Sequence, residues 1–123
     1  LFPYTTLFRS PMFQFCLGIP WGAENDPETI EYLKSRIPEN AHWSAFGIGK
    51  MQLPTVREVA QRGGNVRVGL EDNIYLRKGV KATNEALVEE AKRILAELDI
   101  EPLTPAEARE KFNLRNPHGK GDK

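Results

Sequence analysis

The sequence predicts an α/β fold with three parallel strands, and two features of the chain support this. First, three strand-like segments are each followed by a segment with helical spacing of apolar residues, within residues 11–37, 42–62 and 65–98. Consecutive strand–helix units imply parallel strands joined by right-handed crossovers. Second, each strand carries apolar residues on one face and small or polar residues on the other, which suits a barrel whose outer strand face packs on helices. Three units are too few to close such a barrel.

The first unit is a strand over residues 12–19 followed by a helix. Side chains alternate along a strand, so one face of it would carry Phe13, Phe15, Leu17 and Ile19. Asp26 is expected to be the N-cap of the helix, with Pro27 at its first position. Pro38 is expected to end this helix.

The second unit repeats this plan. Residues 42–48 are expected to form a strand, and residues 49–54 a loop. Pro54 is expected to begin a helix that stops at the Gly63–Gly64 pair, because glycine commonly follows the end of a helix.

The third unit is expected to begin with a strand over residues 65–71, followed by a loop to Ala82. Thr83 or Asn84 would cap a longer helix with an apolar stripe through Leu98. A capping box at residues 104–107 predicts a last short helix.

Composition excludes several classes of protein. The 17 basic residues balance the 17 acidic ones, so no net basic face points to nucleic acid as a partner. A single cysteine, Cys16, excludes an internal disulfide framework. No apolar run approaches the roughly 20 residues that span a bilayer, so a membrane partner is not expected and a cytoplasmic protein is the default.

The two ends of the chain differ from the segment between them. Residues 1–10 have neither an amphipathic period nor a signal-peptide layout, and YTTLFRS is the in-frame translation of a string that resembles a sequencing-library adapter. Residues 1–10 are therefore interpreted as an adapter-derived artefact. Residues 11–115 are expected to form a partial barrel domain, and residues 116–123 a polar, disordered tail.

The stretch from Asn65 to Gly79 carries the candidate chemistry. Arg67 and Glu71 would lie on one face of the third strand, and Asp72 follows at once. One interpretation is a reaction site with two adjacent carboxylates and an arginine behind them. The alternative is a solvated strand face in which Arg67 forms a structural ion pair with Glu71.

The motif VRVGLEDN, followed by a Lys–Gly turn and a helix opening on Asn, resembles the last strand and loop of the β-keto acid cleavage enzymes, whose best-known member is the 3-keto-5-aminohexanoate cleavage enzyme. FQFCLGIPWGA, HWSAFGIGKMQLP and TPAEAREKFNL occur in the order that this family shows. The resemblance covers about Pro11 to Leu114. It implies a (β/α)8 TIM barrel, of which this chain would be the C-terminal part, about three βα units.

The resemblance also implies roles for residues. Glu71 would complete a Zn²⁺ site, Asp72 would be the general base, and Arg67 would be its partner. The family takes its other zinc ligands from a His-x-His pair near an early strand. This chain has only His42 and His118, far apart, so the metal site would be incomplete.

The implied reaction converts a β-keto acid and acetyl-CoA into acetoacetate and a new acyl-CoA, in a complete protein that is a homo-oligomer. It would proceed through a substrate enolate, attack on the thioester, transfer of coenzyme A and retro-Claisen cleavage. Trp21, Gly18, the Gly47–Gly49 tip and Lys50 are candidates to line the mouth where coenzyme A enters, and the alternative for Trp21 is a packing role. As a fragment, the chain is expected to be inactive alone. The alternative is a non-catalytic partial barrel or binding module that lacks the metal site.

Overall fold

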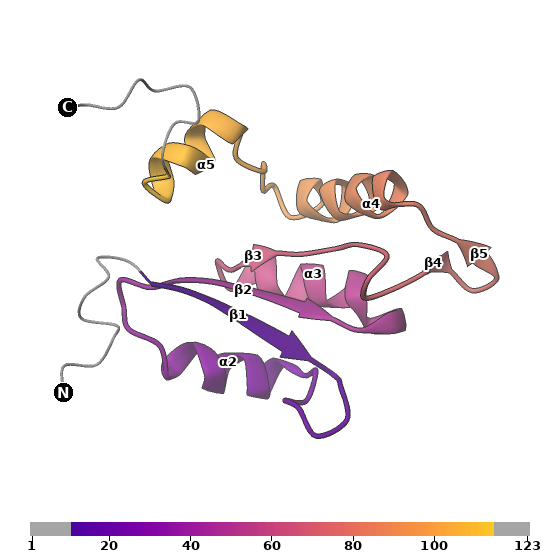
Figure 1. Ribbon diagram of the computed structural model, residues 1–123, viewed down its shortest axis with the longest axis horizontal. Coiled ribbons are helices and arrows are strands. Elements are labelled where there is room, and N and C mark those ends of the chain that lie inside the picture. Colours follow the sequence, from indigo (N-terminus) through magenta and orange to yellow (C-terminus); the bar gives the residue numbers. More distant parts are fainter. Residues whose placement is uncertain (1–10, 115–123) are drawn as a thin grey trace.

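The computed structural model describes residues 11–114. The expectations for residues 1–10 and 116–123, including His118, concern residues outside this part. The elements, in chain order (Figure 1), are β1 (Met12–Leu17), α2 (Pro27–Ser35), β2 (His42–Gly47), the 3-10 helix η1 (Gly49–Met51), α3 (Gln52–Gln61), β3 (Asn65–Val66), β4 (Tyr75–Arg77), β5 (Val80–Lys81), α4 (Asn84–Ala96) and α5 (Pro105–Lys111).

The main sheet has the strand order β1–β2–β3, and both pairings are parallel. In the register, Gln14 lies opposite Ser44, and Ala45 lies opposite Val66. Each strand reaches the next through a helix, as the alternation of strand-like and helical segments predicted. The α/β class with a parallel sheet is therefore confirmed.

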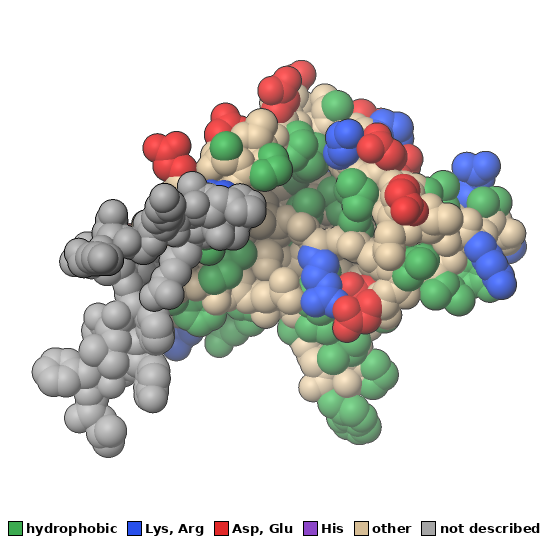
Figure 2. Space-filling view, turned by 45° about the horizontal axis from the view of Figure 1, so that its top comes forward, with side chains coloured by type: hydrophobic (Ala, Val, Ile, Leu, Met, Phe, Trp, Pro, Cys, Tyr) green, Lys and Arg blue, Asp and Glu red, His purple; other side chains and the backbone are tan. Residues whose placement is uncertain are grey.

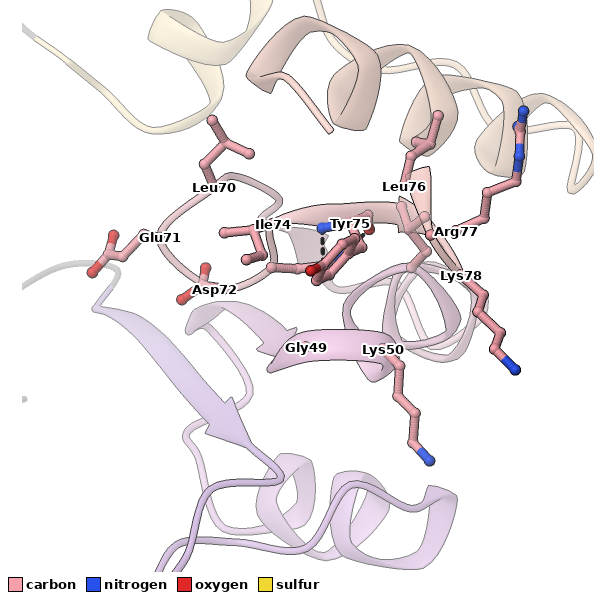
Figure 3. A pocket seen from close by; sticks show the side chains of 13 residues that line it. Gly49, Lys50, Leu70, Glu71, Asp72, Ile74, Tyr75, Leu76, Arg77 and Lys78 are labelled. Atoms are coloured by element: carbon pink, nitrogen blue, oxygen red, sulfur yellow. Dashed lines mark hydrogen bonds between the residues drawn. The ribbon is translucent and has the colours of Figure 1, made fainter. Parts of the chain in front are cut away.

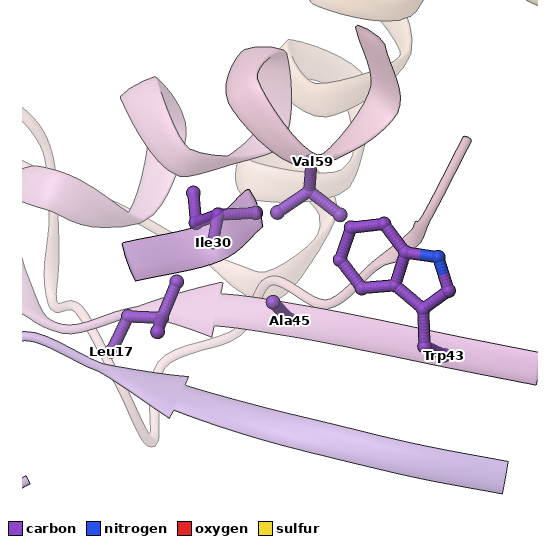
Figure 4. Packing of buried hydrophobic residues seen from close by; sticks show 5 residues of the cluster. All are labelled: Leu17, Ile30, Trp43, Ala45 and Val59. Carbon is purple, nitrogen blue, oxygen red and sulfur yellow. The ribbon is translucent and has the colours of Figure 1, made fainter. Parts of the chain in front are cut away.

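The two faces of the sheet differ in chemistry. Leu17, Trp43 and Ala45 project from β1 and β2 toward Ile30 of α2 and Val59 of α3, and these five residues form one buried cluster (Figure 4). Helices α2 and α3 therefore cover one face of the sheet. The opposite face carries the alternate residues of β1 and β2, which include Gln14, Ser44 and Phe46. This face therefore mixes polar and apolar side chains, and Arg67 lies against it through contacts with Gln14 and Phe46.

A second apolar cluster joins α3 to α4. It consists of Val56, Ala60, Ala91, Ile94 and Leu95, with Val66 and Val68 packed against it. Because Val66 and Val68 pack against this cluster, α3 and α4 fix the position of the backbone after β3. Arg67 lies between these two valines, so its Cα is held in place as well.

The predicted helix caps are present, and the structure decides between Thr83 and Asn84. The Asp26 side chain accepts a hydrogen bond from the Thr29 backbone N–H, which is the main reason that the pKa of Asp26 is lowered. Thr83 is the N-cap of α4, whereas the Asn84 side chain accepts a hydrogen bond from the Leu70 backbone N–H. The capping box of α5 is confirmed.

Four local expectations were wrong. Strand β1 ends at Leu17 instead of Ile19, because Gly18 adopts a positive φ of 79° and the chain bends there. Strand β3 ends at Val66 instead of extending to residue 71, because its pairing with β2 stops at Ala45 and the chain then turns at residues 70–72. Residues 49–54 are not a loop: η1 and the first turn of α3 occupy them. The segment before Ala82, expected to be an irregular loop, contains the β4–β5 hairpin.

None of the helices within residues 11–114 is both long enough and apolar enough to cross a bilayer. On the face seen in Figure 2, acidic and basic side chains are mostly intermixed. This mixture agrees with the balanced charge of the sequence.

The isolated 123-residue chain is expected to self-associate. Strands β1 and β3 are the two edges of the main sheet among the described residues, and an exposed strand edge is a template for pairing with another chain. Size-exclusion chromatography with light scattering should show species larger than the 13.9 kDa monomer. A clean monomer with cooperative unfolding would contradict this prediction and would weaken the partial-barrel interpretation.

Candidate functional site

Arg67 is the centre of a network at the carboxyl ends of the parallel strands. Its Nε lies 3.1 Å from Asp72 Oδ2, and its Nη2 lies 3.3 Å from Asp72 Oδ1. Nη2 also donates to Glu71 Oε2 at 2.6 Å, and Nη1 donates to Gln14 Oε1 at 3.1 Å. The guanidinium carbon lies 4.2 Å from the centre of the Phe46 ring. A single cation therefore joins both carboxylates of the motif to the polar faces of β1 and β2.

A tight turn holds Asp72 in place. Its backbone N–H donates to the Gly69 carbonyl oxygen at 3.2 Å, and its own carbonyl accepts from the Gly49 N–H at 2.7 Å. The next residue, Asn73, is buried, and its side chain forms two hydrogen bonds with the backbone of Tyr75, at 2.6 and 3.0 Å. The Asp72 carboxylate is thus positioned by backbone contacts on both sides of it.

The turn also explains how Arg67 reaches Glu71. In a continuous strand, residues four apart are separated by about 13 Å along the chain. The turn at residues 70–72 brings Glu71 back toward Arg67, so their contact does not depend on a shared strand face. The expected contact between Arg67 and Glu71 is therefore present, as the ion-pair alternative also predicted, but it is formed across a turn and not along a strand.

The two adjacent carboxylates have different environments. The Glu71 side chain is 82% exposed, the Arg67 side chain 31%, and the Asp72 side chain only 5%. Asp72 is held as a buried acceptor with a fixed orientation, whereas the exposed Glu71 carboxylate is paired with Arg67 through Oε2 and presents Oε1 to solvent. Such a difference in exposure between adjacent carboxylates is expected where the two groups have separate roles in a site.

A cavity of about 800 Å³ adjoins the two carboxylates. Glu71 and Asp72 lie at one side of it, and residues 70–79 together with Gly49, Lys50 and Leu53 line it (Figure 3). Its volume falls within the range of about 300–1,000 Å³ that is usual for ligand sites. Of the residues expected at a mouth for coenzyme A, the lining includes Gly49 and Lys50 but not Gly18, Gly47 or the fully exposed Trp21.

The described residues do not by themselves fit a zinc ion. A catalytic zinc site needs three protein ligands and an open position. Within residues 11–114 no three His, Cys, Asp or Glu side chains are grouped so that they could hold a metal. Glu71 can offer one carboxylate. His42 lies at the start of β2, with its ring edge-on to Phe112 at a centroid distance of 4.8 Å.

The 123-residue chain alone is accordingly expected to retain little zinc. One exposed carboxylate in place of three ligands gives weak and reversible coordination. Metal analysis after incubation with equimolar zinc and dialysis measures the retained metal. One tightly held zinc per chain would contradict the prediction, and a Glu71→Gln variant is the control for specific retention.

Two residues of the network were not singled out as site residues from the sequence. Gln14 and Phe46 come from β1 and β2, far from Arg67 along the chain. A signal for Gln14 did exist, because it lies on the polar face of an otherwise apolar strand. Phe46 gave no such signal, since an aromatic residue in a strand is ordinarily taken as core.

Comparison with known proteins identifies the family. Residues 5–114 match the sequence profile of the β-keto acid cleavage enzymes. The chain is 42% identical over 103 residues to a 3-dehydrocarnitine:acetyl-CoA trimethylamine transferase of Rhizobium meliloti, an alignment that covers 84% of this chain and 34% of the relative. It is 38% identical to the 3-keto-5-aminohexanoate cleavage enzymes of Fusobacterium nucleatum and Acetoanaerobium sticklandii, covering 87% and 83% of this chain and 39% and 38% of those proteins. The chain thus spans between about a third and two fifths of the length of these relatives, and it belongs to the β-keto acid cleavage enzyme family.

Proposed function

We propose that this chain is the C-terminal part of an enzyme that converts a β-keto acid and acetyl-CoA into acetoacetate and a new acyl-CoA. The observation that supports this most directly is the environment of Asp72. Its carboxylate is nearly buried, both of its oxygens accept hydrogen bonds from Arg67, and it lies at the wall of a cavity large enough for a substrate.

In the proposed reaction Asp72 is the general base. It accepts the α-proton of the β-keto acid, and the resulting enolate attacks the thioester carbon of acetyl-CoA and displaces the coenzyme A thiolate. The thiolate then attacks the original keto carbon, the carbon–carbon bond breaks, and the proton returns to the leaving acetoacetate, so that a new acyl-CoA remains. Arg67 occupies one side of the carboxylate, so the remaining lone pairs of Asp72 are the ones that can face a bound substrate. Arg67 is therefore the group that orients the base.

The proposal includes a (β/α)8 barrel, to which this chain contributes about three βα units. Three features support it: the parallel order of β1, β2 and β3, the helices on one face of that sheet, and the polar residues on the other. The zinc ion that the family resemblance implies would take Glu71 as one ligand. At least two more ligands would have to come from outside residues 11–114.

The relatives support acetyl-CoA as the co-substrate. One is a 3,5-dioxohexanoate:acetyl-CoA acetone transferase of Paraburkholderia graminis, and another a 3-oxoadipate:acetyl-CoA acetyltransferase of Cupriavidus necator. Their names share acetyl-CoA and differ in the keto acid. We therefore propose acetyl-CoA and the β-keto acid class, without choosing one keto acid.

A chimaera tests the proposed function. Residues 11–114 replace the matching segment of the Rhizobium meliloti transferase, with which they share 42% identity. The chimaera is expected to consume acetyl-CoA in the presence of 3-dehydrocarnitine, because Arg67, Glu71 and Asp72 would then meet the rest of the site. A chimaera that unfolds cooperatively but has no turnover would favour the alternative of a non-catalytic binding module.

A further inference from the structure

Unpaired lysines lie at the cavity that adjoins the Asp72 carboxylate. Lys50 and Lys78 both line this cavity, and within residues 11–114 neither has a hydrogen bond or an ion pair. Arg57, Arg62, Lys92 and Arg93, by contrast, each have a carboxylate partner. The positive charge of Lys50 and Lys78 is therefore available to an anionic ligand.

The directions of the side chains are consistent with one anion site. Figure 3 shows Lys50 and Lys78 extending to the same side of the hairpin, whereas Arg77 points the other way, toward α4. At the hairpin end of the molecule, Figure 2 shows Lys and Arg side chains among hydrophobic ones, without acidic neighbours in that view. The basic residues of this hairpin are Arg77, Lys78 and Lys81.

An apolar wall lies between the carboxylates and the lysines. Leu70, Ile74 and Tyr75 line the cavity and expose 36%, 54% and 46% of their surface. Large apolar side chains that remain exposed beside polar groups are typical of a ligand site. The Tyr75 ring also offers a flat face on which a purine base can stack.

The hairpin that carries Lys78 is fixed before any ligand binds. Tyr75 pairs with Lys81 across the two strands, and Gly79 supplies the positive φ of 78° that the turn requires. Asn73 holds the backbone of Tyr75 with two hydrogen bonds. A ligand at this hairpin would therefore meet an ordered surface, which lowers the entropic cost of binding.

From this arrangement we propose that Lys50, Lys78 and Tyr75 bind the phosphate-bearing nucleotide end of coenzyme A. The two ammonium groups contact its phosphates, and Tyr75 stacks on its adenine. The pantetheine arm then crosses the apolar wall and delivers the thioester to Asp72. This assignment rests on the proposed function, and it adds the residues that would recognise coenzyme A as distinct from a simpler thioester.

Calorimetric titration of the 123-residue chain tests the assignment without any need for turnover. The probes are coenzyme A, 3′,5′-ADP as the nucleotide alone, pantetheine as the arm alone, and inorganic phosphate. We expect 3′,5′-ADP to compete with coenzyme A. The double variant Lys50→Gln/Lys78→Gln is expected to weaken the binding of both about tenfold, the combined effect of two partly exposed charge pairs, and to leave pantetheine unaffected.

Lys81→Gln is the matched control, because Lys81 lies on the same hairpin but does not line the cavity. It should change no affinity. Equal losses for Lys81→Gln and the double variant would indicate a diffuse charge effect and overturn the assignment. So would an unchanged affinity of the double variant, no binding of coenzyme A to the chain, or inorganic phosphate that binds as tightly as 3′,5′-ADP.

Kinetics of the chimaera separate this inference from the proposed function. The lysine variants should raise KM for acetyl-CoA about tenfold with little change in kcat, and should not affect S-acetylpantetheine. Turnover with an unchanged KM for acetyl-CoA in the lysine variants would contradict the coenzyme A assignment but not the proposed function. Lysine-dependent binding of 3′,5′-ADP without any turnover of the chimaera would contradict the proposed function but not the coenzyme A assignment.

Discussion

Replacing Asp72 by asparagine in the chimaera is expected to lower kcat about 10²–10⁴-fold, the usual contribution of a positioned general base. Asparagine has nearly the same volume as aspartate, and its amide oxygen can still accept one of the two hydrogen bonds from Arg67. The fold should therefore persist while the proton acceptor is lost. Acetoacetate formation from acetyl-CoA and a panel of β-keto acids measures the effect.

Glu71→Gln is the matched control for this prediction, since it removes a carboxylate next in the chain. The Glu71 side chain is 82% exposed, so its replacement should change the free energy of unfolding by about 0.5 kcal/mol or less. If Glu71 is a metal ligand, this variant loses zinc first and activity as a consequence, whereas Asp72→Asn keeps its zinc. Near-normal turnover by Asp72→Asn would remove the base assignment.

The sequence predicted the α/β class with its parallel sheet because strand alternation and helix caps are local signals. The capping box at Thr104 and the N-cap at Asp26 depend on residues three positions apart, and both formed as expected. The choice between Thr83 and Asn84 was not local. The Asn84 side chain is engaged by the Leu70 backbone, fourteen residues earlier in the chain, so tertiary structure decided the cap.

The candidate site was predictable only in part, for a similar reason. The spacing of Arg67, Glu71 and Asp72 in the sequence indicated these three residues as site candidates. Gln14, which also bonds to Arg67, comes from a strand 53 residues away and could not be found in this way. The β4–β5 hairpin was missed because its strands have three and two residues, too short for an alternating pattern. The sequence therefore indicated Lys78 only as a turn residue, whereas the structure places it at the lining of the cavity.

Arg67→Ala is expected to destabilise the chimaera by about 3 kcal/mol and to reduce its turnover about as much as Asp72→Asn does. The substitution leaves the nearly buried Asp72 carboxylate without its cation, which is the costly outcome for a buried pair. It also removes the group packed over Phe46 and the donor to Gln14. Urea unfolding and steady-state kinetics measure the two effects separately.

A double-mutant cycle distinguishes orientation of the base from a direct action of Arg67 on substrate. If Arg67 acts through Asp72, then Arg67→Ala should add little further loss of turnover in the Asp72→Asn background. The two substitutions should also be non-additive in the free energy of unfolding. Arg67→Ala should destabilise the Asp72→Asn background less than the original chimaera, because that background has no buried carboxylate left without its cation. Arg67→Lys should recover part of the stability but little of the activity, since an ammonium cannot reproduce the paired contacts of Nε and Nη2 with the two Asp72 oxygens. Fully additive losses would show instead that Arg67 and Asp72 act independently.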